Sequence, residues 1–232
     1  MILFDIEKVT KAVVIFAHPD DAESSAGGTI SKLTKNNVEV TIVNVALGDK
    51  GKSTSNVRQD ESVNSAHVLN VKNVINLGYL DGEFENNLEL REKVTKIIRE
   101  NKPELVICPD PEPIFFAEAY INHRDHRETG WAVVDVISSA VGNEKYFPET
   151  KPHSVPYLLC AGSKDPNCVV DISEDIDKKI ESISCYKSQL SSDTDEVFSA
   201  IRENSKHIGR LVDVEYGEAY RFCLLSNNTD LI

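Results

Sequence analysis

Residues 13–23 read Val-Val-Ile-Phe-Ala-His-Pro-Asp-Asp-Ala-Glu, and this stretch decides the fold. Its apolar first half is typical of a strand that is buried on both faces of a parallel sheet. Pro19 cannot donate a hydrogen bond to a neighbouring strand, so the strand is predicted to end at His18 or just before it. Ligands bind beyond the carboxyl ends of the strands in open α/β sheets, and the polar half of this stretch is therefore a candidate site.

Length and composition restrict the class of protein. A chain of 232 residues can bury a full core, and we expect a single domain over residues 1–232. Its 38 acidic and 25 basic residues give a formal charge of −13, which argues against a nucleic-acid backbone or an anionic membrane as partner. No apolar run approaches membrane-spanning length, and the acidic first eight residues do not resemble a signal peptide.

The cysteines indicate the redox compartment. The chain has five, scattered and without a C-x-x-C pair: Cys108, Cys160, Cys168, Cys185 and Cys223. This pattern is typical of reduced thiols and not of a disulfide framework or a zinc knot. We therefore expect a cytoplasmic protein.

Strand and helix patterns alternate along the chain. Strands are predicted at residues 13–17, 38–46, 73–77, 105–108, 157–160 and 168–172, and helices at residues 30–35, 57–69, 88–100, 127–141, 174–187 and 195–209. Such alternation favours parallel β-α-β units with right-handed crossovers. The sequence therefore predicts a Rossmann-like, doubly wound α/β fold, with a mostly parallel sheet flanked by helices. Its first and fourth strands would be neighbours.

A second polar cluster, His-Arg-Asp-His at residues 123–126, follows the fourth predicted strand and an irregular segment at residues 109–122. If the first and fourth strands are neighbours, this cluster lies opposite His18, Asp20 and Asp21. The loop at residues 48–56 follows the second strand and faces the same side of the sheet. We expect this loop and the segment 109–122 to form the rim of a pocket.

The two clusters together offer a metal-ligand set. His18, Asp21 and His126 supply two imidazole nitrogens and one carboxylate oxygen, which zinc favours at catalytic sites that keep an open position. Asp20 is then left beside the metal, where a carboxylate can accept a proton from an attacking water. The set suits the hydrolysis of an amide.

His123 and Asp125 complete this interpretation. His123, with Asp125 nearby to orient it, could stabilise an oxyanion or protonate a leaving amine as imidazolium. Each cluster also has a simpler interpretation, because the first could be a turn and the second a helix start capped by Asp125. Their joint occurrence at the ends of two predicted buried strands favours a site.

These motifs resemble a known family. Residues 17–23 (Ala-His-Pro-Asp-Asp-Ala-Glu) and 27–30 (Gly-Gly-Thr-Ile) resemble the A-H-P-D-D-x-E…G-G-T signature of the LmbE-like (PIG-L) family. Residues 123–126 are similar to its H-x-D-H motif, and Arg58 and Glu61 match its R-x-x-E motif. Residues 185–189 and 217–222 are similar to its C-terminal motifs. The resemblance spans residues 12–222 and implies a zinc-dependent deacetylase of N-acetylglucosamine-type sugars or glycoconjugates.

The resemblance also implies a role for each motif residue. It implies one zinc ion per chain, bound by His18, Asp21 and His126. Asp20 would be the general base, and His123, oriented by Asp125, would act on the oxyanion and the leaving amine. Arg58 would contact sugar hydroxyls. Members of the family are often trimers or hexamers, so a homo-oligomer is implied as well.

The chain departs from the family pattern at two positions. Arg124 stands where relatives usually have proline, and Tyr186 stands where many have histidine. Both differences bear on the identity of the substrate and not on the metal site. The main alternative is therefore an amidase that acts on a non-sugar or thiol-conjugated amide with the same metal site.

Two alternatives come from other classes of protein. A phosphoacceptor receiver module also carries an acidic pair after its first strand, but this chain is too long, and the two histidines of the second cluster favour zinc over magnesium. The second alternative is a protein that binds metal and sugar without turnover, but Asp20 and His123 are both intact.

The aromatic residues Phe115, Phe116 and Tyr120 could stack on a sugar ring or pack the long segment, and both options are open.

Overall fold

A computed structural model describes residues 1–51, 53–116, 120–190 and 193–225. Residue 52 of the expected loop and residues 117–119 of the expected rim segment lie outside the described residues. One sheet has eight strands in the order β1-β9-β10-β8-β5-β2-β3-β4. These strands are β1 (Ile2–Leu3), β2 (Lys11–Phe16), β3 (Glu39–Ala46), β4 (Asn73–Tyr79), β5 (Leu105–Pro109), β8 (Tyr157–Ala161), β9 (Cys168–Asp171) and β10 (Gly217–Leu224).

The sheet is mostly parallel, which confirms the predicted α/β class. Strand β2 pairs in parallel with β3 on one side and with β5 on the other, so the predicted first and fourth strands are neighbours. Strand β10 was not predicted, and it runs antiparallel between β8 and β9. It mixes apolar residues with charged ones such as Glu218, which is buried because it binds Lys179 and the backbone N–H groups of Gly28 and Thr29.

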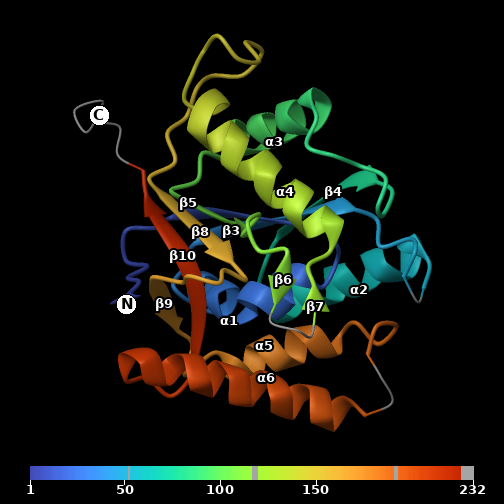
Figure 1. Cartoon of the computed structure of the whole chain (residues 1–232), viewed down its shortest axis with the longest axis vertical. Helices are drawn as coiled ribbons and strands as arrows, with labels where there is room; N and C mark the ends of the chain where they lie inside the picture. The colour runs from blue at the N-terminus through green and yellow to red at the C-terminus, as the bar shows by residue number, and fades with distance from the viewer. Residues whose placement is uncertain (52, 117–119, 191–192, 226–232) are drawn as a thin grey trace.

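Helices cover both faces of the sheet (Figure 1). Helices α3 (Leu88–Asn101) and α4 (Arg124–Asp135) pack on one face, and α4 continues into a π-helical turn, η1 (Val136–Ala140). Helices α1 (Asp21–Lys35), α2 (Ser55–Val68), α5 (Ile176–Ser184) and α6 (Thr194–Gly209) lie on the other face, and a 3₁₀ turn, η2 (Arg210–Val212), follows α6. Within the described part of the chain, no helix is long and apolar enough to cross a membrane.

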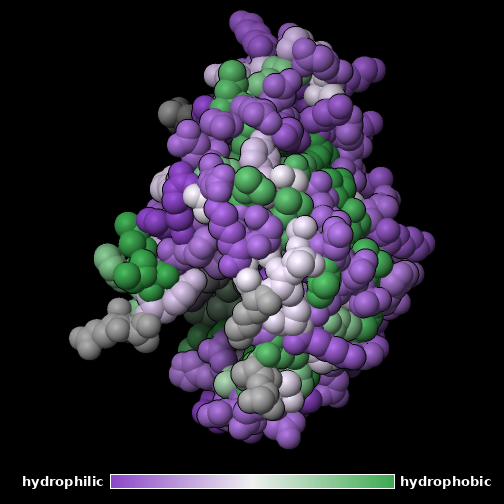
Figure 2. Space-filling view, turned by 90° about the vertical axis from the view of Figure 1, so that its right-hand side faces the viewer, coloured by the Kyte–Doolittle hydropathy of each residue, from purple (hydrophilic) through white to green (hydrophobic). Residues whose placement is uncertain are grey.

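A small antiparallel hairpin projects beside the carboxyl ends of the strands. It is formed by β6 (Phe115–Phe116) and β7 (Tyr120–Ile121). Several large hydrophobic side chains on and next to it are exposed: Ile114, Phe115, Tyr120 and Ile121. Figure 2 shows hydrophobic residues gathered at this hairpin, at the left of the view, beside a hollow. The rest of this surface is largely hydrophilic.

Helix α1 begins at Asp21, nine residues before the predicted start at residue 30. The prediction was wrong because Gly27 and Gly28 have low intrinsic helix propensity. Tertiary packing decides instead: a Cβ atom on Gly28 would lie 2.7 Å from the side chain of Ile172, so only glycine lets the helix approach this closely. As a consequence, Asp21 belongs to the first turn of a helix and not to a loop.

Helix α4 also begins earlier than predicted, at Arg124. It lies close against the end of β5, where a Cβ atom on Gly130 would stand 2.5 Å from the carbonyl oxygen of Pro109. This close approach places the start of α4, residues 123–126, next to the carboxyl end of β2. The two polar clusters of the sequence therefore meet in space.

Candidate active site

Asp21 lies at the centre of the two clusters. Its Oδ2 atom is 3.3 Å from Nδ1 of His18 and 3.2 Å from Nε2 of His126. The same oxygen accepts a hydrogen bond of 2.8 Å from the backbone N–H of His18, which fixes the carboxylate across the turn at Pro19. The structure thus brings all three predicted metal ligands into direct contact.

The second nitrogen of each imidazole is bound to a protein oxygen. Nε2 of His18 lies 3.1 Å from Oδ2 of Asp125, and Nδ1 of His126 lies 3.1 Å from Oδ1 of Asn122. Metal-binding histidines typically donate their other N–H to a carboxylate or a carbonyl, which fixes the tautomer and the ring orientation. The donor set and its outer contacts therefore fit a divalent metal ion bound by His18, Asp21 and His126.

Two further side chains, Asp81 and Asn122, lie beside the candidate metal ligands. Among the residues that the structure describes, two groups have ligand atoms that all lie within 4.8 Å of one another. One group is His18, His123 and His126, and the other is His18, Asp81 and Asp125. Asp81 and Asn122 were not singled out from the sequence. The only local signal for Asn122 is its position one helical turn before His126, and Asp81 is placed by the end of β4.

The charges of this cluster are mutually stabilising. Burial lowers the pKa of His18, but contacts with Asp125 and Asp21 outweigh this effect and raise it to about 10. Burial also opposes the charge on Asp21, yet the neighbouring imidazoles of His126 and His18 hold its pKa well below the usual range. Without a metal, the imidazoles therefore keep protons where a cation would bind, and metal binding must displace those protons.

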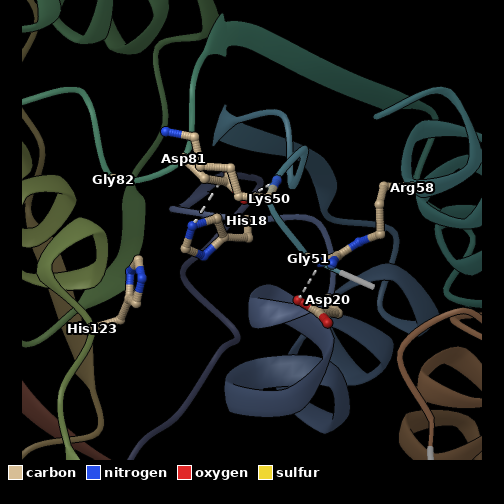
Figure 3. Close-up of a pocket in the computed structure, with 8 residues that line it drawn as sticks. All are labelled: His18, Asp20, Lys50, Gly51, Arg58, Asp81, Gly82 and His123. Carbon is tan, nitrogen blue, oxygen red and sulfur yellow. Dashed lines mark hydrogen bonds and ion pairs between the residues drawn. The ribbon is translucent and has the colours of Figure 1, made fainter. Parts of the chain in front are cut away.

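Asp20 has an unusual backbone conformation. Its φ angle is 106°, a left-handed value that costs free energy for a residue other than glycine and that is found at functional sites. Nη2 of Arg58 lies 3.0 Å from Oδ1 of Asp20 and also donates to the carbonyl oxygen of Pro19, so one guanidinium holds this turn (Figure 3). Burial and the charge of Asp21 raise the pKa of Asp20 to about 7, against the opposing effect of Arg58.

His123 is held differently from the sequence-based expectation. Its Nδ1 atom accepts a hydrogen bond of 3.2 Å from the backbone N–H of Asp125, so His123 and not Asp125 caps helix α4. The proton of a neutral ring is then on Nε2. The Asp125 carboxylate is 3.9 Å from Nδ1 of His123, which is too long for a hydrogen bond. Burial and the charges of His18 and His126 lower the pKa of His123, which favours the neutral imidazole over the expected imidazolium.

Asp125 instead contacts the first cluster. Its buried carboxylate binds Nε2 of His18 and accepts a hydrogen bond of 2.7 Å from the backbone N–H of Gly82. Burial opposes its charge, but these contacts lower the pKa of Asp125, which keeps it ionised. The carboxylate is therefore placed to orient His18.

This contact gives a prediction for Asp125→Asn. The variant should bind its metal roughly 10–100-fold more weakly, as is typical when an outer contact of a ligand is weakened. Metal affinity measured by competition with a chelator checks this result, with His123→Ala as the comparison that should keep its metal. Unchanged affinity together with a lower kcat would mean that Asp125 acts through His123.

A cavity of about 440 Å³ opens over these residues (Figure 3). Its lining residues come from the ends of β2, β3 and β4 and from the starts of α2 and α4: His18, Asp20, Lys50, Gly51, Arg58, Asp81, Gly82 and His123. The loop after β3 therefore forms part of the rim, as predicted. Asp81 fixes this loop, because its carboxylate accepts hydrogen bonds from the backbone N–H groups of Gly48 and Lys50.

Arg58 forms one wall of this cavity. Its side chain is 5% exposed. Gly48 has a φ angle of 68°, and a Cβ atom there would lie 3.2 Å from the guanidinium carbon of Arg58. Arg58 thus fills the space that a larger residue in the loop would need. Its Nε atom is buried and has no hydrogen-bond partner among the described residues.

The two acidic motif residues outside the cavity brace its walls. Glu23 accepts hydrogen bonds from the hydroxyl groups of Ser65 and Tyr186, which joins α1 to α2 and to the chain after α5. Glu61 accepts hydrogen bonds from the backbone N–H and the hydroxyl group of Ser188. The R-x-x-E motif is therefore tied directly to the C-terminal motif at residues 185–189.

The two residues that depart from the family pattern, Tyr186 and Arg124, contact other groups of the protein. Tyr186 is 1% exposed, and its hydroxyl group donates to Glu23. Arg124 donates to the carbonyl oxygen of Phe84 and lies 3.8 Å from Glu85 and from Glu128. Neither residue lines the 440 Å³ cavity.

Comparison with known proteins gives the family. Residues 13–137 match the model of the PIG-L family, described as GlcNAc-PI de-N-acetylase, and the chain belongs to this family. It is 29% identical over 227 residues to the diacetylchitobiose deacetylase of Thermococcus kodakarensis, covering 92% of this chain and 83% of that protein. It is 28% identical to the probable N-acetyl-alpha-D-glucosaminyl L-malate deacetylase 2 of Bacillus anthracis, covering 80% of this chain and 84% of that protein.

A solved structure agrees with this result. The N,N'-diacetylchitobiose deacetylase from Pyrococcus horikoshii superposes with a TM-score of 0.84 at 29% identity, and the match covers 98% of this chain and 90% of that one. The family and the fold predicted from the sequence are thereby confirmed.

Proposed function

We propose that this protein is a zinc-dependent hydrolase that removes the acetyl group from an N-acetylglucosamine-type sugar or glycoconjugate. The observation that carries the proposal is the convergence of His18, Asp21 and His126 at one edge of a polar cavity, with Asp20 beside them. The names of the similar proteins support the reaction and the sugar. A zinc ion held by these three ligands would supply the Lewis acid that activates water and polarises the amide carbonyl.

The protein groups divide the remaining steps. The oxygen of a water molecule attacks the amide carbon, the C–N bond breaks, and a carboxylic acid and a free amine are released. Asp20 accepts the proton of the water, and this proton is the one that the leaving nitrogen needs. Burial raises the pKa of Asp20 in the metal-free site, and a raised pKa helps a carboxylate to return a proton as well as to accept it. Nε2–H of His123 donates a hydrogen bond to the carbonyl oxygen as negative charge develops on it.

The lining of the cavity favours a sugar over an apolar amide. Asp81 and Arg58 place a carboxylate and a guanidinium group at its walls, and Lys50 adds an ammonium group at the rim. A site built from such groups recognises hydroxyl groups and discriminates strongly against ligands that lack them. Arg58 contributes twice, because it also holds Asp20.

Amine release from a matched set of amides tests the proposal. The set contains N-acetylglucosamine, its β-linked disaccharide, an N-acetylglucosaminide with an anionic aglycone, and an N-acetylated amine without a sugar. We expect the free amine from at least one sugar substrate, and none after removal of the metal. Release from the non-sugar amide alone would favour the amidase alternative, and no release from any of them would favour a binding protein.

Three other predictions from the sequence, on domain organisation, location and oligomeric state, also stand as proposals. Strands from both ends of the chain, β1 and β10, belong to the same eight-stranded sheet, which supports a single domain. We further propose a cytoplasmic location, supported by the free cysteines, and a homo-oligomer, supported by the family resemblance.

A further inference from the structure

A second cavity borders the same metal ligands from the other side. It has a volume of about 170 Å³ and lies over the ends of β2, β5 and β8. Asp21 and His126 form one of its walls, whereas His18 and Asp20 line the larger cavity. The described residues of the predicted rim segment, 109–116 and 120–122, border this second cavity and do not line the first. The cluster of candidate ligands therefore separates two cavities of different size.

The second cavity has a different chemical character from the first. Its walls include three aromatic rings and three small or apolar residues: Phe16, Phe116, Tyr120, Pro109, Ala161 and Gly162. Two of its polar side chains already have protein partners. Asp110 binds Arg221 and the backbone N–H of Glu112, and Asn122 binds the carbonyl oxygen of Pro113 and His126. These two side chains therefore do not need hydrogen bonds from a ligand.

We infer that the second cavity is an acyl pocket, which receives the carbon chain of the amide while the sugar occupies the larger cavity. This inference rests on the proposed function. The reacting carbonyl must lie at the ligand cluster, so the two halves of the amide extend to opposite sides of it. The hydroxyl-rich half matches the polar cavity, and the hydrocarbon half matches the aromatic one.

The volume predicts which acyl groups are accepted. A cavity of roughly 150 Å³ can hold a benzene molecule, so 170 Å³ leaves room for an acyl chain of about four to six carbon atoms. An acetyl group fills only part of this space. The protein should therefore also hydrolyse N-propionyl and N-butyryl substrates, with no sharp loss at the first added methylene.

Ser25 gives a sharp test of this pocket. It lies on α1, one turn after Asp21, and lines the second cavity. Ser25→Leu would fill part of the cavity, and leucine favours a helix more than serine does. Ser24→Leu is the matched control, because Ser24 is the exposed neighbour on the same helix and lines neither cavity. Phe116→Ala changes the pocket in the opposite direction by removing one aromatic wall.

The experiment measures kcat/KM for one glucosamine derivative carrying N-acetyl, N-propionyl, N-butyryl or N-hexanoyl groups. We expect Ser25→Leu to lower kcat/KM roughly 10–200-fold more for the butyryl than for the acetyl substrate. This is the range of discrimination that one methylene group produces in an apolar pocket. Phe116→Ala should shift the preference towards the hexanoyl substrate, and Ser24→Leu should keep the wild-type ratios. Circular dichroism verifies that each variant is folded.

Two results would overturn the inference, and they differ from a failure of the proposed function. If the acetyl substrate is hydrolysed but the ratio between chain lengths is the same in Ser25→Leu as in the wild type, the second cavity does not hold the acyl group. A wild-type protein that rejects the propionyl substrate would have the same meaning. If no N-acyl glucosamine is hydrolysed by any form, the proposed function and the acyl pocket both fail.

Discussion

Asp20→Asn should lower kcat by roughly 10²–10⁴-fold, the usual effect of removing a positioned general base, while the metal stays bound. The amide side chain keeps the shape of the carboxylate and its contact with Arg58, but it cannot accept a proton. Turnover and metal content are measured on the same preparation. Asp60→Asn, an exposed change of the same type on α2, is the matched control and should match the wild type in both.

Asp21→Asn should behave in the opposite way to Asp20→Asn. It weakens the acceptor that faces both imidazoles, so metal affinity should fall and excess metal should restore part of the activity. The two roles would have to be exchanged if Asp20→Asn lost its metal while Asp21→Asn kept it.

His126→Ala should have the second large effect, a loss of bound metal. The change removes one of three ligands, so the loss of affinity should exceed the roughly 10–100-fold that follows from removing an outer contact. Metal analysis after dialysis measures the occupancy, and activity should fall with it. His67→Ala, which removes an exposed histidine on α2, should retain its metal. Full occupancy in His126→Ala would contradict the ligand assignment.

The buried strands of the sheet were predictable from the sequence because they are continuous apolar runs. The pairing of β2 with β5 followed from the alternation of strands and helices. The start of α1 was not predictable from local pattern, since Gly28 disfavours a helix by itself and is accommodated by close packing against Ile172. Strand β10 was missed for a related reason, because the partners that neutralise its buried Glu218 come from α1 and α5.

The candidate site likewise has one part that was predictable from the sequence and one part that depends on the tertiary structure. Its candidate metal ligands stand in compact motifs, and their residue types led to the prediction of a metal site for amide hydrolysis. The contacts between the motifs depend on the fold: Asp125 was paired with His123, two residues away, but its carboxylate binds His18 from the other motif. Asp81 and Asn122 carry no motif of their own, and only the tertiary structure places them beside His18 and His126.

Titration of the metal-free protein with zinc tests the central claim most directly. The metal is removed with a chelator, zinc is added back in steps, and amine release from the preferred N-acetylglucosamine substrate is measured at each step. The site formed by His18, Asp21 and His126 predicts no turnover without metal, a linear recovery of activity, and a break at one zinc ion per chain. Full activity of the metal-free protein would contradict the account, and so would a recovery that requires a second equivalent.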